Sequence, residues 1–382
     1  KGWSLVRSAS FSIMVARIVF IFSILLLVSC VGESENEEKL EVGFYQPLNF
    51  PQPTLDLEDN PITTEGFVLG RKLFYDNKLS AGNIISCAEC HNQSHAFTHH
   101  GHDLSEGVLV DRFGARNSQP IQNLAFLNDF TWDGAVNLLW RQPVIPITEE
   151  VEMNETLNNV VQKLKDDEEY VKMFKSVFNS ENDDVVNSVN MLKALTKFMG
   201  AMISSNSKYD KYVRGEAGGN FTIQEKQGLD LFQQKCASCH DGELFTNQEF
   251  INNGIGVNPN LPDELGRSRI TIPNPDLTIE EGKAHPDYYK FRVPSLRNVE
   301  KTFPYMHDGR YVQLKKVLDF YDDDTFPFMQ KMDNLDPRLW KENNGVVQLG
   351  IPMTELEKEA IISFLKTLTD YEFLNDERFE KP

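Results

Sequence analysis

The chain has 382 residues, of which 40% are hydrophobic and 11% aromatic, enough to bury a core in about two or three domains, so a mainly disordered chain is excluded. Its 57 Asp and Glu residues against 38 Lys and Arg give a formal net charge of −19. Nucleic acid requires clustered positive charge, so the composition argues against a nucleic-acid partner and suits a basic protein partner. Five cysteines are too few for a disulfide scaffold.

Residues 1–29 are predicted to be a lipoprotein signal peptide. They contain Lys1, Arg7 and Arg17 and no acid, followed by an apolar run that ends at Cys30. The run after Arg17 is about a dozen residues long, whereas a membrane span requires about 20, so cleavage is favoured over a permanent anchor. The four residues ending at Cys30 resemble a bacterial lipobox, which predicts lipidation of Cys30. An ordinary signal peptide and an uncleaved anchor are the alternatives.

The stretch after the signal, residues 30–60, is predicted to be a lipidated flexible tether. Its first part is polar and acidic, with Glu33, Glu35, Glu37 and Glu38 close together. The expected location is therefore the periplasmic face of a bacterial membrane, with contact to that membrane through the lipid alone.

Two Cys-x-x-Cys-His motifs use the remaining four cysteines: Cys87-Ala-Glu-Cys90-His91 and Cys236-Ala-Ser-Cys239-His240. This spacing is the signature of covalent c-type haem, because two thiols bind one porphyrin while the adjacent histidine binds its iron. One such motif is also compatible with a zinc site or a thiol redox pair. Extra histidine ligands for zinc follow the first motif only, at His95, His99, His100 and His102. The pair of motifs therefore predicts two covalently bound haems.

The predicted fold is mainly α, with two cytochrome-c-like haem domains and long irregular connections. A Gly-x-x-Leu-Phe segment precedes each motif, at residues 70–74 and 228–232, which indicates an internal duplication. The predicted boundaries are 61–212 for the N-terminal haem domain, 213–372 for the C-terminal one and 373–382 for a tail.

Helices are expected at four places. Apolar residues recur at helical spacing over 156–178 and 184–204. Capping boxes begin two more helices at Thr222 and Thr354, the second carrying an apolar set of Leu356, Ile361, Phe364, Leu365 and Leu368. Residues 253–287 are rich in Pro, Gly and Asn and are predicted to be loop.

Between and after the motifs, several short segments occur in a fixed order from Gly66 to Thr369. The most specific are Arg116-Asn-Ser118, Trp132-Asp-Gly134, Gly242-Glu-Leu-Phe-Thr246, Phe291-Arg-Val-Pro-Ser-Leu-Arg-Asn298 and Pro304-Tyr-Met-His-Asp-Gly309. In this series the chain resembles the bacterial di-haem cytochrome c peroxidases, a family that includes the MauG-type enzymes.

The resemblance implies roles for single residues. Trp132 matches the tryptophan between the two haems, although a buried tryptophan is usually only core. Gln142 and Glu152 match the distal pocket, with Glu152 as the acid/base; the alternative for Glu152 is a solvated residue in an acidic run. A structural calcium ion is implied by the matches at Asn117, Thr302 and Pro304, for which ordinary turn residues are the alternative.

The resemblance also bears on the haem ligands. Peroxidases that require reductive activation carry a Gly-His segment before the Arg-Asn-Ser motif, where this chain has Gly107-Val108-Leu109. The first haem is therefore expected to have an open sixth site, unless a histidine of residues 99–102 folds back. At the second haem the family's ligand position falls on Tyr321, with Met306 as the alternative. A phenolate ligand favours oxidising chemistry, whereas a thioether raises the potential.

Three functions follow from these expectations. The favoured one is a peroxidase that reduces hydrogen peroxide to water at the haem of Cys87, Cys90 and His91, with electrons from a small redox protein such as cytochrome c. The second is a MauG-like enzyme that uses peroxide to oxidise a partner protein or another substrate. The third is a di-haem electron carrier with no enzymatic activity. Members of the family are often dimers, so a homodimer is also expected.

Overall fold

The computed structural model describes residues 41–99, 101–261, 264–272, 274, 278–322 and 329–382. The predicted signal peptide and Cys30 lie outside these residues, as does the first part of the predicted tether. Residues 42–382 form one unit. Within the described ranges, no helix combines the length and the hydrophobicity that crossing a membrane demands.

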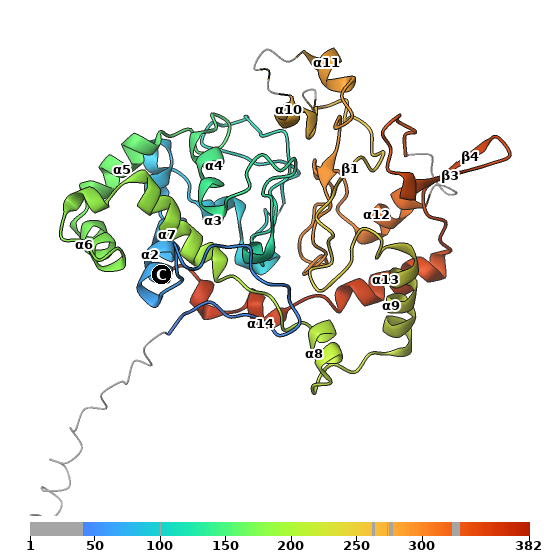
Figure 1. Cartoon of the computed structure of the whole chain (residues 1–382), viewed down its shortest axis with the longest axis horizontal. Coiled ribbons are helices and arrows are strands. Elements are labelled where there is room, and N and C mark those ends of the chain that lie inside the picture. The colour runs from blue at the N-terminus through green and yellow to red at the C-terminus, as the bar shows by residue number, and fades with distance from the viewer. Residues whose placement is uncertain (1–40, 100, 262–263, 273, 275–277, 323–328) are drawn as a thin grey trace, which may run out of the picture. The chain divides into compact units, whose positions relative to one another are not determined.

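The described residues are mainly helical with little sheet, which confirms the predicted helical class (Figure 1). The α-helices are α2 (Thr64–Phe74), α3 (Cys87–Cys90), α4 (Val144–Thr148), α5 (Leu157–Lys165), α6 (Glu168–Val177), α7 (Ser188–Gly200), α8 (Lys208–Arg214), α9 (Ile223–Lys235), α10 (Ser268–Thr271), α11 (Ile279–Lys283), α12 (Leu314–Tyr321), α13 (Glu355–Lys366) and α14 (Tyr371–Leu374). The strands form two antiparallel pairs, β1 (Phe250–Ile251) with β2 (Phe291–Arg292) and β3 (Trp340–Asn343) with β4 (Val346–Leu349).

Local capping explains where several helices begin. Thr222 and Glu225 form a capping box at α9, and Thr354 and Glu357 form one at α13, as the sequence predicts. The predicted helix over 156–178 is instead two helices, because the Asp167 side chain accepts backbone N–H bonds and begins α6.

Two other expectations about the helices were wrong. The predicted loop over 253–287 contains α10 and α11, and α11 begins with its own capping box at Thr278. Leu356, predicted to pack on the core, is 78% exposed, whereas Ile361 and Phe364 of the same helix are fully buried. Leu356 lies in the first turn of α13, on the face away from the cluster around Phe364.

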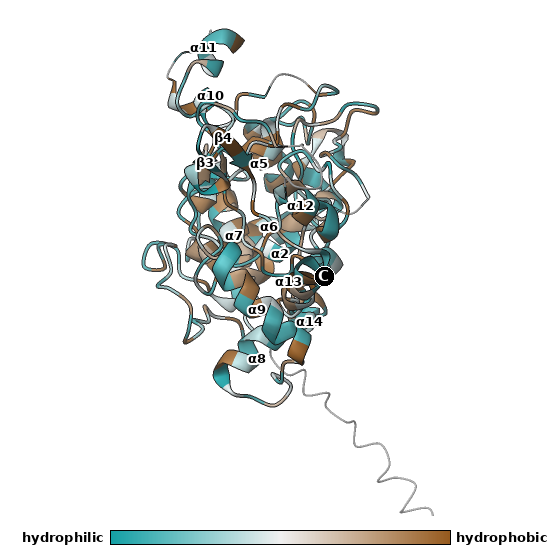
Figure 2. Ribbon diagram, turned by 90° about the vertical axis from the view of Figure 1, so that its right-hand side faces the viewer, coloured by the Kyte–Doolittle hydropathy of each residue, from teal (hydrophilic) through white to brown (hydrophobic). Residues whose placement is uncertain are grey.

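Two helix pairs repeat the same close contact. We call residues 42–212 the first half of the chain and residues 213–382 the second half. α2 packs on α7 in the first half, and α9 packs on α13 in the second (Figure 1). Gly70 in α2 lies against the carbonyl of Ala194, and Gly228 in α9 lies against the carbonyl of Ala360, so close that a Cβ at either glycine would collide with backbone. The shared Gly-x-x-Leu-Phe segments therefore serve the same purpose, which is close helix packing. Figure 2 shows hydrophilic and hydrophobic residues alternating around α9, as expected of a helix that covers a core.

The segment that precedes α2 packs against the folded unit. Phe50 is 6% exposed and its ring lies 5.3 Å from that of Phe126. The backbone N–H of Thr54 donates to the carbonyl of Ala125 at 2.8 Å. The structure therefore differs from a flexible tether over residues 42–60, because buried aromatic contacts hold this segment in place.

The C-terminal segment returns to the first half of the chain. Phe379 is buried, with its ring 6.1 Å from Phe67 and 6.3 Å from Phe198. Its carbonyl accepts a hydrogen bond from the Tyr75 hydroxyl at 2.7 Å. Residues from both ends of the chain thus complete the core around α2 and α7.

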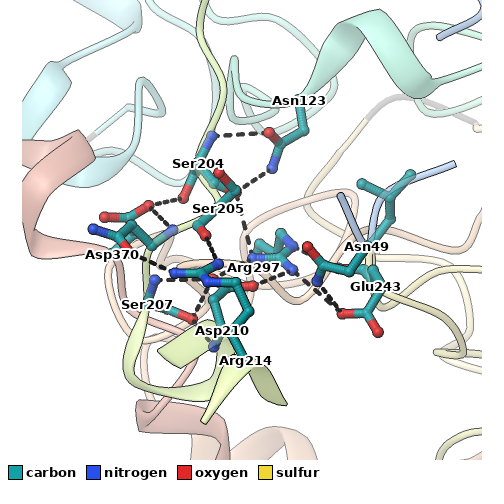
Figure 3. A network of polar contacts seen from close by, with 12 residues as sticks. Asn49, Asn123, Ser204, Ser205, Ser207, Asp210, Arg214, Glu243, Arg297 and Asp370 are labelled. Carbon is teal, nitrogen blue, oxygen red and sulfur yellow. Dashed lines mark hydrogen bonds and ion pairs between the residues drawn. The ribbon is translucent and has the colours of Figure 1, made fainter. Parts of the chain in front are cut away.

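A buried polar network joins the two halves (Figure 3). The fully buried guanidinium of Arg297 donates to both carboxylate oxygens of Asp210, at 3.0 and 2.9 Å. Ser204 exchanges two hydrogen bonds with the Asn123 side chain and donates its hydroxyl to Asp370. Because each of these groups is satisfied, the network fixes the segment that connects α7 with α8 to both halves.

Candidate functional site

A first cavity, enclosing about 610 Å³ of space free of protein atoms and partly open to solvent, lies between α3 and α4. One set of its lining residues is Cys87, Cys90 and His91. Facing them are Gln142 and Glu152, which are more than fifty residues away along the chain. The fold therefore brings the first haem-binding motif and the predicted distal residues into one cavity.

His91 is held so that one ring nitrogen remains for a metal. Its Nδ1 lies 2.7 Å from the carbonyl oxygen of Phe97, to which it donates when that nitrogen carries the proton. Burial lowers the pKa of His91 to about 4, so the ring is neutral at neutral pH. A neutral imidazole with Nδ1–H bonded to a carbonyl is the usual arrangement of a histidine that binds metal through Nε2. The residues around the motif therefore fit a haem iron.

The backbone around Glu152 is fixed by close contacts. Gly107 lies so near the backbone of Glu152 that a Cβ at position 107 would collide with it. Next to it, the N–H of Val108 donates to the carbonyl of Glu152 at 2.8 Å. The N–H of Met153 donates to the carbonyl of Pro146 at 3.0 Å, which ties this turn to α4. Gly107 was missed as a site residue, although a glycine in the family's Gly-His segment marks its place.

Glu152 is poised to exchange protons near neutral pH. Burial raises its pKa from 4.5 to about 7, with a smaller contribution from the negative charge of Glu149. A carboxyl group with a pKa near the working pH is effective as an acid and as a base. The amide of Gln142 lies in the same cavity and offers both donors and an acceptor.

Neither His99 nor His102 is among the residues that line the first cavity. Their rings stack on each other with centroids 4.8 Å apart, and His102 Nδ1 lies 3.3 Å from the carboxylate of Glu106. His100 lies outside the described residues. The segment Gly107-Val108-Leu109, where the resemblance to the family would place a Gly-His pair, contains no histidine.

A second cavity, enclosing about 1250 Å³ of space free of protein atoms and partly open to solvent, lies beside α9 and α12. Cys236 and His240 of the second motif line it, and so do both predicted ligands, Tyr321 and Met306. Trp132 lines it too, although it comes from the first half of the chain. The second cavity is thus closed by residues from both halves.

The second histidine repeats the geometry of the first. The Nδ1 of His240 lies 3.2 Å from the carbonyl oxygens of both Phe245 and Pro294, and burial lowers the pKa of His240 to about 4. Its Nε2 is therefore left for a metal. Cys239 is half-buried and is not among the residues that line the second cavity, whereas its partner Cys236 is.

Tyr321 is the last residue of α12, and hydrogen bonds hold both its carbonyl and its hydroxyl. Its carbonyl accepts from the N–H of Ile351 at 2.6 Å, and its hydroxyl accepts from the Asn253 amide at 3.2 Å. Burial raises the pKa of Tyr321 to about 12. Met306 adopts a left-handed backbone conformation with φ of 73° in the same cavity. Geometry therefore brings both predicted ligands to the second cavity and orients the hydroxyl of one.

Trp132 links the two halves through its own hydrogen bonds. The indole N–H donates to the carbonyl of Asn117 at 2.9 Å, and the Trp132 carbonyl accepts from the N–H of Arg292 at 2.8 Å. Asn117 in turn donates its N–H to the carbonyl of His307 at 2.7 Å. The predicted calcium residues Asn117, Thr302 and Pro304 all line the second cavity, but the Asn117 carbonyl is already bonded to Trp132.

Ion pairs outside the predicted set of site residues hold the surroundings of the second cavity in place. Arg116 pairs with Asp133 at 2.7 Å and with Glu264 at 2.7 Å. Lys358, only 1% exposed, pairs with Asp322, which directly follows Tyr321. The Arg-Asn-Ser motif signalled Arg116, whereas Lys358 has only the helical pattern of α13 around it and gave no such signal.

Comparisons with known proteins agree with this geometry. The family model described as di-haem cytochrome c peroxidase matches residues 64–218. The methylamine utilization protein MauG of Methylorubrum extorquens is 31% identical over 336 residues, which cover 86% of this chain and 84% of that protein. The chain belongs to the di-haem cytochrome c peroxidase family. Family membership implies two c-type haems and a peroxidase type of oxidoreductase.

The proteins similar to this chain include both cytochrome c peroxidases and MauG proteins. Cytochrome c551 peroxidase of Pseudomonas aeruginosa is 30% identical over 337 residues, covering 86% of this chain and 84% of that protein. A solved structure described as a MauG-like protein associated with microbial copper homeostasis is 28% identical, with a TM-score of 0.74, and the match covers 88% of this chain and 98% of that one. The chain is therefore similar to cytochrome c peroxidases and to MauG proteins alike.

Proposed function

We propose that this protein is a di-haem peroxidase that reduces hydrogen peroxide to water, H₂O₂ + 2 e⁻ + 2 H⁺ → 2 H₂O, with electrons from a small redox protein such as cytochrome c. The observation that carries the proposal is the first cavity, where Cys87, Cys90 and His91 face Gln142 and Glu152. A cavity with only a haem-binding motif would suit electron transfer. A titratable carboxyl group opposite that motif suits chemistry on a bound peroxide.

The residues present fit two haems. Cys87 and Cys90 would attach the first and His91 would bind its iron, while Cys236, Cys239 and His240 would hold the second. The second iron would take Tyr321 as its other ligand, with Met306 as the alternative. When bound, the haems supply the electrons and the site where peroxide is cleaved.

The chain's own residues manage the protons. Glu152 takes a proton from one oxygen of the peroxide and returns it to the departing oxygen, because a carboxyl group with a pKa near 7 can do both at neutral pH. The Gln142 amide orients the peroxide by hydrogen bonding. Trp132, which lines the second cavity and belongs to the first half, relays electrons between the two haems. A calcium ion bound near Asn117, Thr302 and Pro304 would stabilise this region.

We infer that the chain is exported, carries lipid on Cys30 and acts in the periplasm as a tethered protein. The acidic composition suits docking of a basic electron donor, because opposite charges speed association.

A MauG-like activity, in which peroxide is used to oxidise a partner protein or another substrate, is the second candidate. Val108 at the place of the distal histidine and Tyr321 in the second cavity favour it. A di-haem electron carrier without enzymatic activity is the third candidate, and Glu152 in the first cavity argues against it.

The test is the absorption spectrum, from the visible to the near-infrared, of the fully oxidised protein before and after one equivalent of peroxide. An immediate spectral change with a new near-infrared band supports an open first haem and MauG-like oxidation. A reaction only after one haem has been reduced supports the peroxidase that requires activation, and contradicts the open first haem. No reaction in either state supports the electron carrier.

A further inference from the structure

Arg292 is a buried arginine inside the second cavity. It is 6% exposed and is among the residues that line the cavity. Its backbone is fixed in β2, opposite Phe250 of β1, and its N–H donates to the carbonyl of Trp132. The backbone of Arg292 is therefore held by the sheet that borders the cavity.

The guanidinium of Arg292 has no anionic partner among the residues that the structure describes. Among the described residues it makes no hydrogen bond or ion pair, and its Nε is fully buried. The charge of Asp129 acts on it, but no bond joins the two side chains in the part of the chain that the structure describes. Burial lowers the pKa of Arg292 to about 10, so it stays protonated at neutral pH. Two further arginines at the contact between the halves, Arg116 and Arg297, each bind carboxylates.

A buried cation without a counter-ion is strongly unfavourable, and the described part of the chain supplies no such anion, which leaves a place for one from a bound group. The described residues lining the second cavity include no Asp or Glu, and Arg292 is the only Lys or Arg among them. Haem carries two propionate carboxylates, and the planar fork of a guanidinium matches a carboxylate with two parallel hydrogen bonds. Resting on the proposed function, we propose that Arg292 binds a propionate of the second haem and keeps it ionised in both redox states.

The pairing of Arg292 with the propionate decides whether reduction of the second haem is accompanied by proton uptake. A buried propionate without a cation takes up one proton from solvent when the haem gains one electron, because reduction adds a negative charge nearby. With Arg292 bound to it, the propionate stays ionised and the electron arrives alone. The titratable lining residues do not replace this effect between pH 6 and 8. Cys236, His240 and Tyr321 are engaged by the haem and its iron, and burial raises the pKa of Tyr305 far above that range.

The experiment is a spectroelectrochemical titration of both haems in the purified holoprotein at pH 6, 7 and 8. In the wild type, the potential of the second haem should not change with pH. In Arg292→Met it should fall, because a positive charge near the iron favours the reduced state. It should also become pH-dependent, by up to about 59 mV for each tenfold change in proton concentration, the value for one proton per electron. The other haem should keep its potential.

Three further variants complete the design. Arg292→Lys keeps a cation and should restore a flat pH profile, whereas Arg292→Gln should behave like Arg292→Met. Arg267→Met is the matched control. Arg267 packs over the ring of Phe250, 3.7 Å from its centroid, and donates to the carbonyl of Asp133, but it does not line the cavity. Its loss removes the same charge near the same strand and should leave the pH profile flat.

Each outcome decides the proposal. A wild-type profile with a slope near one proton per electron overturns it, and so do Arg292→Met and Arg292→Gln profiles as flat as the wild type. If Arg292→Met does not fold, the comparison of Arg292→Gln with Arg292→Lys decides in the same way. Haem content per chain is measured first. Fewer than two haems in the wild type would contradict the proposed function itself, whereas two haems with flat variant profiles contradict only the role of Arg292.

Discussion

The two cavities contain similar motifs and opposite charges. The first is lined by two carboxyl groups, Glu106 and Glu152, and by no Lys or Arg among its described residues. The second is lined by the cation Arg292 and by no carboxyl group among its described residues. A carboxyl group with a raised pKa can supply and accept protons, whereas an arginine holds a fixed charge at every pH of interest. The difference suits proton-coupled chemistry in the first cavity and electron transfer without proton uptake in the second.

The largest effect is expected from removing the carboxyl group of the first cavity. Glu152→Gln should lower peroxide turnover by about 10²–10⁴-fold, because general acid/base catalysis contributes that much. Steady-state turnover with a reduced cytochrome c measures it, with haem content as the check on folding. Glu150→Gln is the control, because Glu150 is exposed, pairs with Arg112 and belongs to the same acidic run. Turnover within tenfold of the wild type in Glu152→Gln would remove Glu152 from the chemistry.

The next effect concerns the buried polar network that joins the two halves. Arg297→Met leaves the buried Asp210 carboxylate without its cation and should lower the free energy of unfolding by about 3–5 kcal/mol. Denaturant unfolding followed by circular dichroism measures it. We expect a single transition, because the network ties both halves into one unit. Arg112→Met, which removes an exposed ion pair, should unfold like the wild type. Two separate transitions in the wild type would show that the halves fold independently.

A smaller effect follows from the pKa of Glu152. Because burial raises this pKa from 4.5 to about 7, the folded state binds the proton more tightly than the unfolded state. The cost of burying the carboxylate is absent below pH 4.5, grows as the pH rises and is complete above pH 7. Glu152→Gln should therefore be more stable than the wild type by about 3 kcal/mol at pH 8, and no more stable at pH 4.

The same titration should appear in the activity of the wild type. Peroxide turnover should fall as the pH falls below about 7, because the carboxylate form accepts the first proton. The decline should be missing from the residual activity of Glu152→Gln. A variant that keeps the decline would assign it to another group.

The smallest effects are expected from substitutions of the predicted ligands in the second cavity. Tyr321→Phe should alter the absorption and electron paramagnetic resonance spectra of the second haem, whereas Met306→Leu should leave them unchanged. Tyr305→Phe is the control, because Tyr305 also lines this cavity. The reverse pattern, with the spectra changing only in Met306→Leu, would make Met306 the ligand and favour ordinary peroxidase activity.

Much of the candidate site could be predicted because it depends on residues close together in sequence. The Cys-x-x-Cys-His spacing places two thiols and an imidazole within one turn of chain. The capping boxes at Thr222 and Thr354 depend on residues three positions apart, and both were predicted. The internal repeat of Gly70 and Gly228 was also visible in the sequence, although its purpose, close contact with α7 and α13, was not.

Other features could not be predicted because they depend on distant segments. Leu356 has the right spacing for a core position, yet it lies on the face of α13 away from the core cluster and is exposed. Residues 42–60 have the composition of a tether, but Phe50 finds an aromatic partner at Phe126. In both cases the partner surface, rather than the segment itself, decides whether a side chain is buried.

The sequence by itself determined the chemical parts of this protein: two haem-binding motifs, the helix starts and the order of the family's segments. Tertiary structure decided which parts meet. It brought Glu152 and His91 into one cavity and raised the pKa of Glu152 by burial, and it set Arg292 at a cavity whose described lining includes no carboxylate. The physical reason is that local spacing fixes covalent attachment and capping, whereas burial and charge pairing depend on contacts between segments far apart in the chain.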